Sequence, residues 1–104
     1  MIAPVLDRHI AIEPEICHGR PHIEGTRIRV QDVAIWHERL GMSVDEIGAE
    51  YDLSLAQIYA ALSYYFDHKD SIDEAITADI AYFEAFKKNN PSKLQEKLRA
   101  LRGH

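Results

Sequence analysis

The sequence predicts a mainly α-helical fold that opens with a short N-terminal β-hairpin, contains a helix-turn-helix and ends with two extra C-terminal helices. Three observations support this prediction. Apolar residues recur every three or four positions from about residue 31 onward. Sequences that cap helix starts occur repeatedly over the same region. Alternation of apolar and polar residues, which is typical of strands, is confined to the first thirty residues.

The first thirty residues predict two short strands joined by a turn. Ile10 and Ile12 alternate with their neighbours, and Ile28 and Val30 alternate with arginines. Gly25 and other turn-forming residues lie between these segments. An exposed strand edge favours pairing with another chain. We therefore expect a homodimer formed through the N-terminal strands.

Four capping boxes predict where helices begin. In each box a serine and a Glu or Gln three residues later satisfy each other's backbone N–H groups. The boxes are Ser43–Glu46, Ser54–Gln57, Ser71–Glu74 and Ser92–Gln95. The apolar spacing places helices at about 31–40, 44–51, 55–67 and 72–89, followed by a last narrow stripe.

The same spacing predicts the face that each helix buries. These faces are Val33, Trp36, His37 and Leu40 in the first helix; Val44, Ile47, Gly48 and Tyr51 in the second; Leu55, Ile58, Tyr59, Leu62 and Phe66 in the third; and Ile72, Ile76, Ile80 and Phe83 in the fourth. His37 is expected to be a core histidine with its hydrogen bonds satisfied.

The segment from Val44 to Tyr64 predicts the helix-turn-helix. Gly48 allows two helices to cross closely, and Asp52 tolerates the left-handed backbone that the turn needs. The side chains expected to fill the interior are Ile47, Leu53, Ile58 and Ala61.

The outward side of the second helix is the candidate DNA-binding face. Its residues are Ser54, Gln57, Ala60 and Tyr64, with Ala56 and Ser63 beside them. Gln57 could contact an adenine edge and Ser54 a phosphate. No Lys or Arg lies on this face, so the positive charge for DNA binding would come from elsewhere, such as Arg27 and Arg29.

Charge is unevenly distributed over the 104 residues, whose net charge is −5. Residues 31–86 carry twelve acidic and two basic side chains, whereas residues 87–104 carry six basic and one acidic. The acidic middle repels phosphate, while the basic tail suits nucleic acid or an acidic protein surface.

The C-terminal helices are the candidate partner-binding region. Asp79 lies within an apolar stripe, where an unpaired carboxylate would be costly, so a basic partner is expected for it. The tail carries an apolar stripe flanked by basic residues, and an isolated helix of that length is marginal in water. The tail residues expected to bind a partner are Leu94, Leu98, Leu101, Arg99 and Arg102; the alternative, left open, is that this stripe closes the protein's own core or a homodimer.

Residues 9–30, HIAIEPEICHGRPHIEGTRIRV, resemble the opening motif of the small bacterial family called domain of unknown function 433. A second block also fits that family's pattern. It consists of Gly41, Ser43, Glu46, Ile47, Tyr51, Leu53, Ser54, Ile58, Ala60, Ala61 and Leu62. The resemblance implies a homeodomain-like fold with a short N-terminal sheet. It also implies a VapB-like antitoxin that neutralises a PIN-like nuclease toxin and can repress its own operon.

No catalytic residue, cofactor or metal site is predicted. The cluster of Cys17, His18 and His22 lacks the second ligand pair that a zinc site needs. Gly19 and Gly25 lack the Lys-Ser/Thr ending of a phosphate loop. The acidic residues near the second helix are expected to form a solvated face. The single cysteine permits no intrachain disulfide.

Together these observations predict a non-enzymatic, cytoplasmic antitoxin-like component, because no signal peptide or membrane span is recognised. Two alternatives stay open. One is a helix-turn-helix repressor without a toxin, and the other is a homo-oligomeric interaction module. We expect a strand plus helix-turn-helix domain at 1–70 and a helical extension at 71–104.

Overall fold

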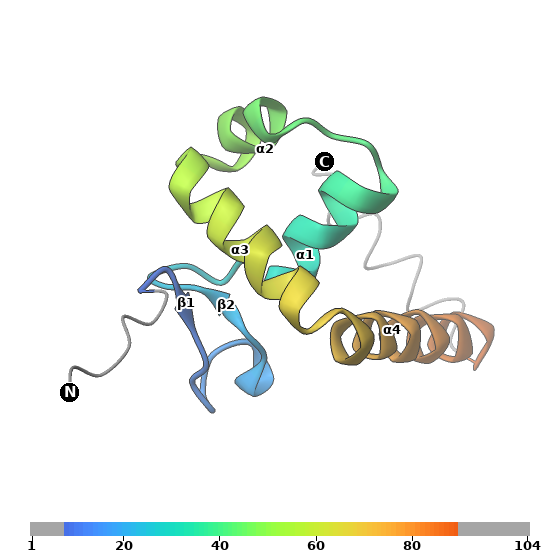
Figure 1. The fold of residues 1–104 in the computed structure, drawn as a ribbon. Coiled ribbons are helices and arrows are strands. Elements are labelled where there is room, and N and C mark those ends of the chain that lie inside the picture. Colours follow the sequence, from blue (N-terminus) through green and yellow to red (C-terminus); the bar gives the residue numbers. More distant parts are fainter. Residues whose placement is uncertain (1–7, 90–104) are drawn as a thin grey trace, which may run out of the picture. The chain divides into compact units, whose positions relative to one another are not determined.

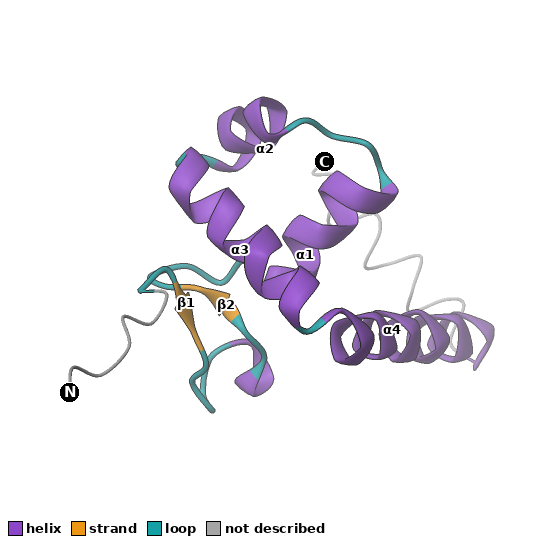
Figure 2. Cartoon of the chain, viewed as in Figure 1, coloured by secondary structure: helices purple, strands orange, loops and turns teal. Residues whose placement is uncertain are grey.

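The structure is a computed structural model that describes residues 8–89. The chain divides into two units, Met1–Ile72 and Asp73–His104. The elements in chain order are β1 (Ile10–Ala11), η1 (Cys17–Gly19), β2 (His22–Ile23), α1 (Val30–Ala34), η2 (Ile35–Arg39), α2 (Val44–Tyr51), α3 (Leu55–Asp67) and α4 (Lys69–Asn89). The fold is mainly helical with a small two-stranded antiparallel sheet, as predicted (Figures 1 and 2).

The helix α3 is the central element of the first unit. It contacts α1, α2, β1 and β2 (Figure 1). Its inner face buries four side chains, which are Ile58, Ala61, Leu62 and Tyr65. They meet apolar residues contributed by the neighbouring elements, namely Ile23, Val30, Val33, Ala34, Ile47 and Leu53. Burial of these apolar surfaces is the main driving force that holds the elements together.

The second strand is not where the sequence analysis placed it. β2 is His22–Ile23, paired antiparallel with β1, whereas Arg29 forms only an isolated bridge with His22. A tight turn explains the difference. The Thr26 hydroxyl donates to the Ile23 carbonyl at 2.9 Å and accepts from the Ile28 N–H at 3.0 Å. The chain therefore reverses at Thr26, and helix α1 begins directly after Arg29.

The predicted helix at 31–40 widens in its second half. After α1 the chain continues as the π-helix η2, in which the Leu40 N–H donates to the Ile35 carbonyl at 2.9 Å. This wider turn rotates the residues that follow relative to a regular helix. Leu40 is consequently 66% exposed, which corrects the prediction that it is buried. His37 is also not a core residue, because it is half-exposed and its Nδ1 lies 2.7 Å from the Glu38 carboxylate.

The single tryptophan joins this segment to the next helix. The ring of Trp36 in η2 stacks on the ring of Tyr51 in α2, with centroids 3.7 Å apart and planes only 4° from parallel. Aromatic pairs in this range of separation contribute about 0.5–1.5 kcal/mol beyond the area that they bury.

Two of the predicted capping boxes are confirmed. The Ser43 and Ser54 hydroxyls accept from the N–H groups of Glu46 and Gln57 at 3.0 and 3.1 Å, and the Glu46 and Gln57 side chains accept the serine N–H groups at 2.8 Å. Asp52 ends α2 in the left-handed conformation, with φ 55° and ψ 51°. These features set the start of both helices and the turn between them.

The start of α4 differs from the prediction. The helix begins at Lys69, so Ser71 lies inside its first turn, and the Ser71 hydroxyl donates to the His68 carbonyl at 3.1 Å. The predicted capping box Ser71–Glu74 is therefore wrong, because the chain turns into α4 directly after α3. The box Ser92–Gln95 and the predicted last helix lie outside the described residues. Within residues 8–89, no helix is long and apolar enough to cross a membrane.

Gly48 lets α2 and the start of α3 approach each other. A Cβ at this position would lie 2.9 Å from the Leu53 carbonyl oxygen and 3.5 Å from Ile58 Cδ1. The first distance is shorter than a normal van der Waals contact, and the atom it meets belongs to the backbone. The approach therefore depends on glycine itself and not on helix propensity.

We expect Gly48→Ala to destabilise the protein by about 1–3 kcal/mol, because the added methyl group overpacks this contact. Helix propensity alone would act in the opposite direction, by about 0.5–1 kcal/mol. The sign of the change in the free energy of unfolding, measured by urea denaturation, is therefore diagnostic. Ala49→Gly, on the exposed side of the same helix, should lower stability by propensity alone. A more stable Gly48→Ala protein would contradict the close approach.

Candidate interaction surface

The helix α3 presents the residues that were predicted to contact DNA. Ser54 is exposed at its N-terminus, while Gln57, Ala60 and Tyr64 are half-buried. The helix spans Leu55–Asp67 and contains no Lys or Arg. Its outward side therefore carries no cation that could neutralise a phosphate, which is the main source of affinity for DNA.

The capping box limits what Gln57 can bind. Its Oε1 accepts the Ser54 N–H at 2.8 Å. A glutamine that recognises adenine uses its oxygen and its nitrogen together, one to accept from N6 and one to donate to N7. Gln57 can do this only if the box opens and leaves the Ser54 N–H without its acceptor. The geometry thus assigns Gln57 to the helix start.

The two arginines predicted to supply positive charge lie in different surroundings. Arg27 is exposed in the turn after Thr26. Arg29 forms a two-pronged ion pair with Asp32, with Nε and Nη2 at 3.2 and 2.9 Å from the two carboxylate oxygens. The Arg29 N–H also donates to Asp32 at 3.0 Å, so this carboxylate closes the start of α1. Arg29 therefore has a structural role at this position.

An apolar stripe on α3 was missed by the sequence analysis. Leu55, Tyr59 and Phe66 are 47%, 56% and 52% exposed, although they were predicted to be buried. Tyr65 and Ala61 occupy the core in their place, at 4% and 0% exposure. Apolar residues surround more of α3 than the core can bury. The spacing alone does not predict which of them remain exposed to solvent. We call Leu55, Tyr59 and Phe66 the α3 stripe.

The neighbouring helix α2 is acidic on its surface. Its exposed carboxylates and that of the following turn are Asp45, Glu46, Glu50 and Asp52. The Ser43 backbone N–H, followed by the Ser43 hydroxyl, lowers the pKa of Glu46 below its usual value of 4.5 because both hydrogen bonds favour the charged form. The exposed side of α2 is therefore negatively charged, which disfavours contact with a polyanion.

A buried polar network fastens the N-terminal segment to the core. The ring of His22 is fully buried, with Nε2 3.0 Å from the Glu13 carboxylate and Nδ1 3.3 Å from the Arg20 carbonyl. The Arg20 guanidinium donates to the buried Gln31 side chain at 2.8 Å. The sequence analysis weighed His22 only as a metal ligand. Its burial and its two oxygen neighbours instead make it a structural tie.

Cys17 and His18 occupy a strained turn. Their φ angles are 54° and 57°, and Gly19 follows with 78°. Two successive non-glycine residues in this region are uncommon and cost roughly 1–2 kcal/mol each. Hydrogen bonds hold the turn, among them one of 3.3 Å from the Cys17 thiol to the Arg27 carbonyl. Among residues 8–89, no three His, Cys, Asp or Glu side chains are grouped to hold a metal ion.

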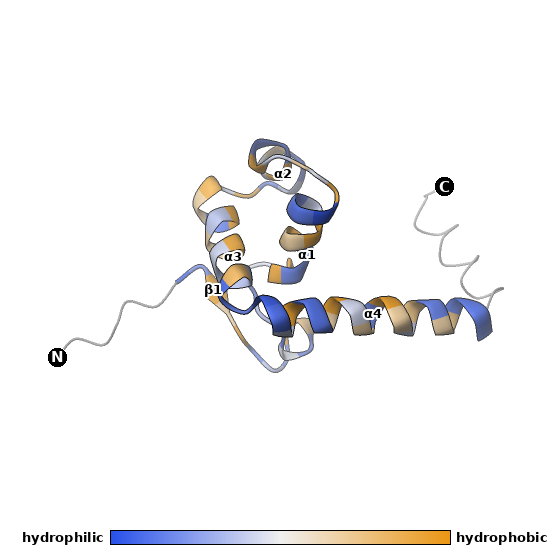
Figure 3. Ribbon diagram, turned by 45° about the vertical axis from the view of Figure 1, so that its right-hand side comes forward, coloured by the Kyte–Doolittle hydropathy of each residue, from blue (hydrophilic) through white to orange (hydrophobic). Residues whose placement is uncertain are grey.

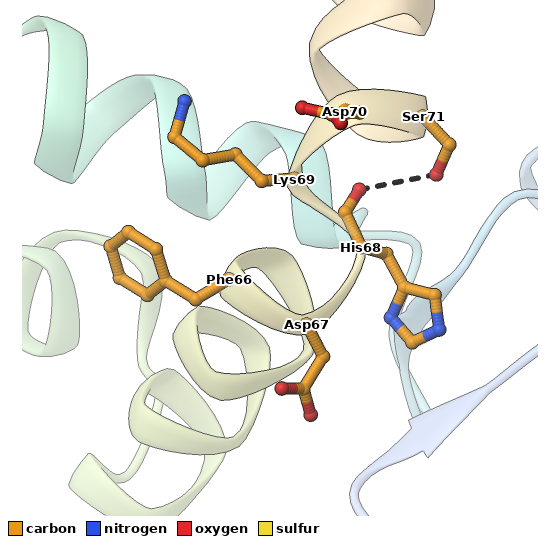
Figure 4. Close-up of a pocket in the computed structure, with 6 residues that line it drawn as sticks. All are labelled: Phe66, Asp67, His68, Lys69, Asp70 and Ser71. Atoms are coloured by element: carbon orange, nitrogen blue, oxygen red, sulfur yellow. Dashed lines mark hydrogen bonds between the residues drawn. The ribbon is translucent and has the colours of Figure 1, made fainter.

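An open pocket of about 330 Å³ lies where α3 meets α4. It is lined by the consecutive residues 66–71, whose side chains point in different directions instead of converging on one point (Figure 4). His68 stacks on Tyr64 and its Nδ1 lies 3.0 Å from the Tyr64 carbonyl. The pocket therefore lacks the paired nucleophile and base, or acid and base, that catalysis requires.

The predicted partner-binding residues are only partly covered by the structure. Asp79 lies half-buried on α4. The other five, Leu94, Leu98, Arg99, Leu101 and Arg102, lie outside the described residues. Their role stays a prediction. The homodimer through the N-terminal strands also stays a prediction, and the strand β1 is two residues long.

Comparison with known proteins places the chain in a family. Residues 10–65 match the family described as "Protein of unknown function (DUF433)". Since this match spans more than half of the chain, the protein belongs to the DUF433 family, which confirms the resemblance inferred from residues 9–30.

A solved structure supports the same assignment. The crystal structure of a DUF433 member protein from Anabaena variabilis ATCC 29413 is 31% identical to this chain, with a TM-score of 0.63. The likeness covers 67% of this chain and 69% of that one. No curated protein is significantly similar to this chain.

The contact between the buried His22 ring and the Glu13 carboxylate predicts that loss of Glu13 destabilises the fold. We expect Glu13→Ala to destabilise the protein by about 1–3 kcal/mol, because it removes a hydrogen-bond partner from a fully buried ring. Glu15→Ala removes an exposed carboxylate two residues away and should change the free energy of unfolding by less than about 0.5 kcal/mol. Equal effects of the two substitutions in urea denaturation would mean that His22 does not depend on Glu13.

The lowered pKa of Glu46 predicts a pH dependence. A carboxyl whose pKa is lower in the folded state stabilises the fold above its unfolded-state pKa, and this contribution is lost as the pH falls through the folded-state value. The wild-type protein should therefore be more stable than Glu46→Gln at neutral pH, and the difference should shrink below about pH 4.5. Glu50→Gln controls for the change in net charge. A difference independent of pH in thermal unfolding would contradict the role of the charge.

Proposed function

We propose that this DUF433 protein is a non-catalytic binding module whose partner is another protein, in the manner of a VapB-like antitoxin that covers a PIN-like nuclease. The observation that carries this proposal is the outward face of α3. It has no cation and it exposes the α3 stripe, Leu55, Tyr59 and Phe66, at about half of each side chain's surface. Large exposed apolar groups that share one helix face are characteristic of protein-binding sites.

The arrangement of α2 and α3 supports a homeodomain-like helix-turn-helix as the scaffold. Two short helices are joined by a turn that contains a left-handed Asp52. Ile47, Leu53 and Ile58 are buried between them, at 0%, 8% and 0% exposure. This geometry presents α3 to a partner as a rigid helix, so little conformational entropy is lost when the partner binds.

The chemistry of the expected partner follows from the charges. A nuclease that uses metal ions has carboxylates at its active site, and arginine pairs with carboxylates through two parallel hydrogen bonds. Arg99 and Arg102, in the basic segment 87–104, supply such groups. Covering the active site by burial is sufficient for inhibition, and no residue of this chain needs to react.

Repression of a promoter is the second candidate function. The helix-turn-helix geometry favours it, because DNA-binding proteins place the second helix of this motif in the major groove. The absence of Lys and Arg from α3 and the capping bond made by Gln57 weigh against it. Arg27 is exposed and would have to supply a phosphate contact together with other bases outside α3.

Co-expression with the product of the adjacent reading frame tests the proposal. We expect a stable complex, and we expect Tyr59→Asp to raise its Kd about tenfold or more, because a charge replaces an anchoring aromatic ring. Asp67→Lys is the control, because Asp67 is exposed on the same helix but is not three or four residues from any member of the α3 stripe, and it should bind like the wild type. Isothermal titration of the purified proteins measures both values.

The two candidate functions give opposite results. If the protein acts on DNA, it should bind its own promoter far more tightly than random DNA, with affinity that falls steeply with salt and is lost in Gln57→Ala. Such a result, together with no complex in co-expression, would replace the first proposal with the second.

A further inference from the structure

The helix α4 carries an apolar stripe that is buried in its first half and exposed in its second. Ile72, Ile76, Ile80 and Phe83 follow one another at intervals of four, four and three residues, so they share one side of the helix. Their exposures are 7%, 1%, 53% and 48%. Apolar residues continue along the helix among hydrophilic ones (Figure 3). Within the part of the chain that the structure describes, the second half of the stripe, Ile80 and Phe83, is therefore an exposed apolar surface.

The charges on α4 are separated along its length. Asp70, Asp73 and Glu74 lie near its start beside the single base Lys69, and Lys87 and Lys88 lie at its end after the single acid Glu84. Lys87 also makes a loose, exposed ion pair with Glu84, at 3.8 Å, which contributes little. A second α4 running in the opposite direction would place its acidic start beside this basic end.

The spacing makes this match specific. Asp73 lies seven residues before Ile80, and Lys87 lies seven residues after it. Seven residues are close to two helical turns, so all three side chains point to nearly the same side. When Ile80 of one copy faces Ile80 of another across a two-fold axis, Asp73 of each copy faces Lys87 of the other.

The basic C-terminal segment is the alternative occupant of the exposed half of the stripe. Residues 91–104 carry four basic side chains, the first of which is Lys93, and one acidic side chain. Lys87 and Lys88 would repel these bases at the end of α4, whereas Asp79 and Glu84, next to Ile80 and Phe83, would attract them. The acidic start of a second α4 meets the same lysines favourably.

We propose that α4 pairs antiparallel with α4 of a second copy of this chain, through Ile80 and Phe83, with the acidic start of each helix beside the basic end of the other. This pairing does not depend on the proposed function. Acids at the start and bases at the end also stabilise an isolated helix through its dipole. The experiment must therefore separate an effect within one helix from an effect between two copies.

Charge reversal on the full chain makes this separation. The variant Asp70→Lys/Asp73→Lys has two basic ends, and Lys87→Glu/Lys88→Glu has two acidic ends. We expect the wild type to be a dimer in sedimentation equilibrium. Each variant alone should have a dimer dissociation constant at least about tenfold higher, and an equimolar mixture of the two variants should recover a dimer. Recovery on mixing cannot arise from a dipole effect within one chain.

Substitutions in the apolar stripe provide the second test. Phe83→Asp should give a monomer with unchanged helix content by circular dichroism. Tyr82→Asp is the matched control, because Tyr82 is 76% exposed and lies outside the stripe, and it should remain a dimer. A wild type that stays monomeric at its highest soluble concentration, a mixture without recovery, or loss of the dimer in Leu98→Asp but not in Phe83→Asp would overturn the pairing.

Discussion

The first unit of this protein depends on the absence of a side chain at Gly48. The space that a Cβ would occupy is taken by the Leu53 carbonyl, which is 2.9 Å away from that position. This contact fixes how closely the turn and the start of α3 lie against α2, and Ile58 fills the interior beside it. The direction of α3 then decides which of its residues meet α1 and the strands and which remain outside. The close approach at Gly48 thus helps to set which side of α3 faces outward.

Local signals in the sequence predicted the helix starts well. A capping box needs only two side chains three residues apart, so Ser43–Glu46 and Ser54–Gln57 form in the structure as the sequence indicates. The failed box at Ser71 shows the limit of this reasoning. There the helix begins two residues earlier, at Lys69, and the Ser71 hydroxyl donates to the His68 carbonyl instead of capping a helix start.

The buried faces were harder to predict, because they depend on which neighbours surround a helix. The apolar residues of α3 extend around more of the helix than its neighbours can cover, so Tyr65 is buried and Tyr59 is exposed. In η2, the π-helical turn displaces Leu40 from the face that regular spacing gives it. Neither the set of neighbours nor a widened turn leaves a signal in the spacing. For the same reason the exposed apolar side chains of α3, which carry the proposed function, could not be found from the sequence.

The motif that defines the family is used to build the fold. Thr26 ties the turn at both ends, the backbone of Arg29 bridges to β2 and its side chain holds Asp32 at the start of α1, and the buried His22 joins β2 to Glu13. The polar side chains of these residues form hydrogen bonds within the fold. In this chain the motif therefore builds the scaffold, whereas the exposed side chains of α3 and α4 take no part in these hydrogen bonds.

The stacked pair of Trp36 and Tyr51 has a practical consequence. Trp36 is the only tryptophan in the chain, and its partner lies in the last turn of α2. Separation of α2 from η2 would unstack the two rings and expose the indole to water. The intrinsic fluorescence of this protein therefore reports on the contact between η2 and α2, and no added label is needed.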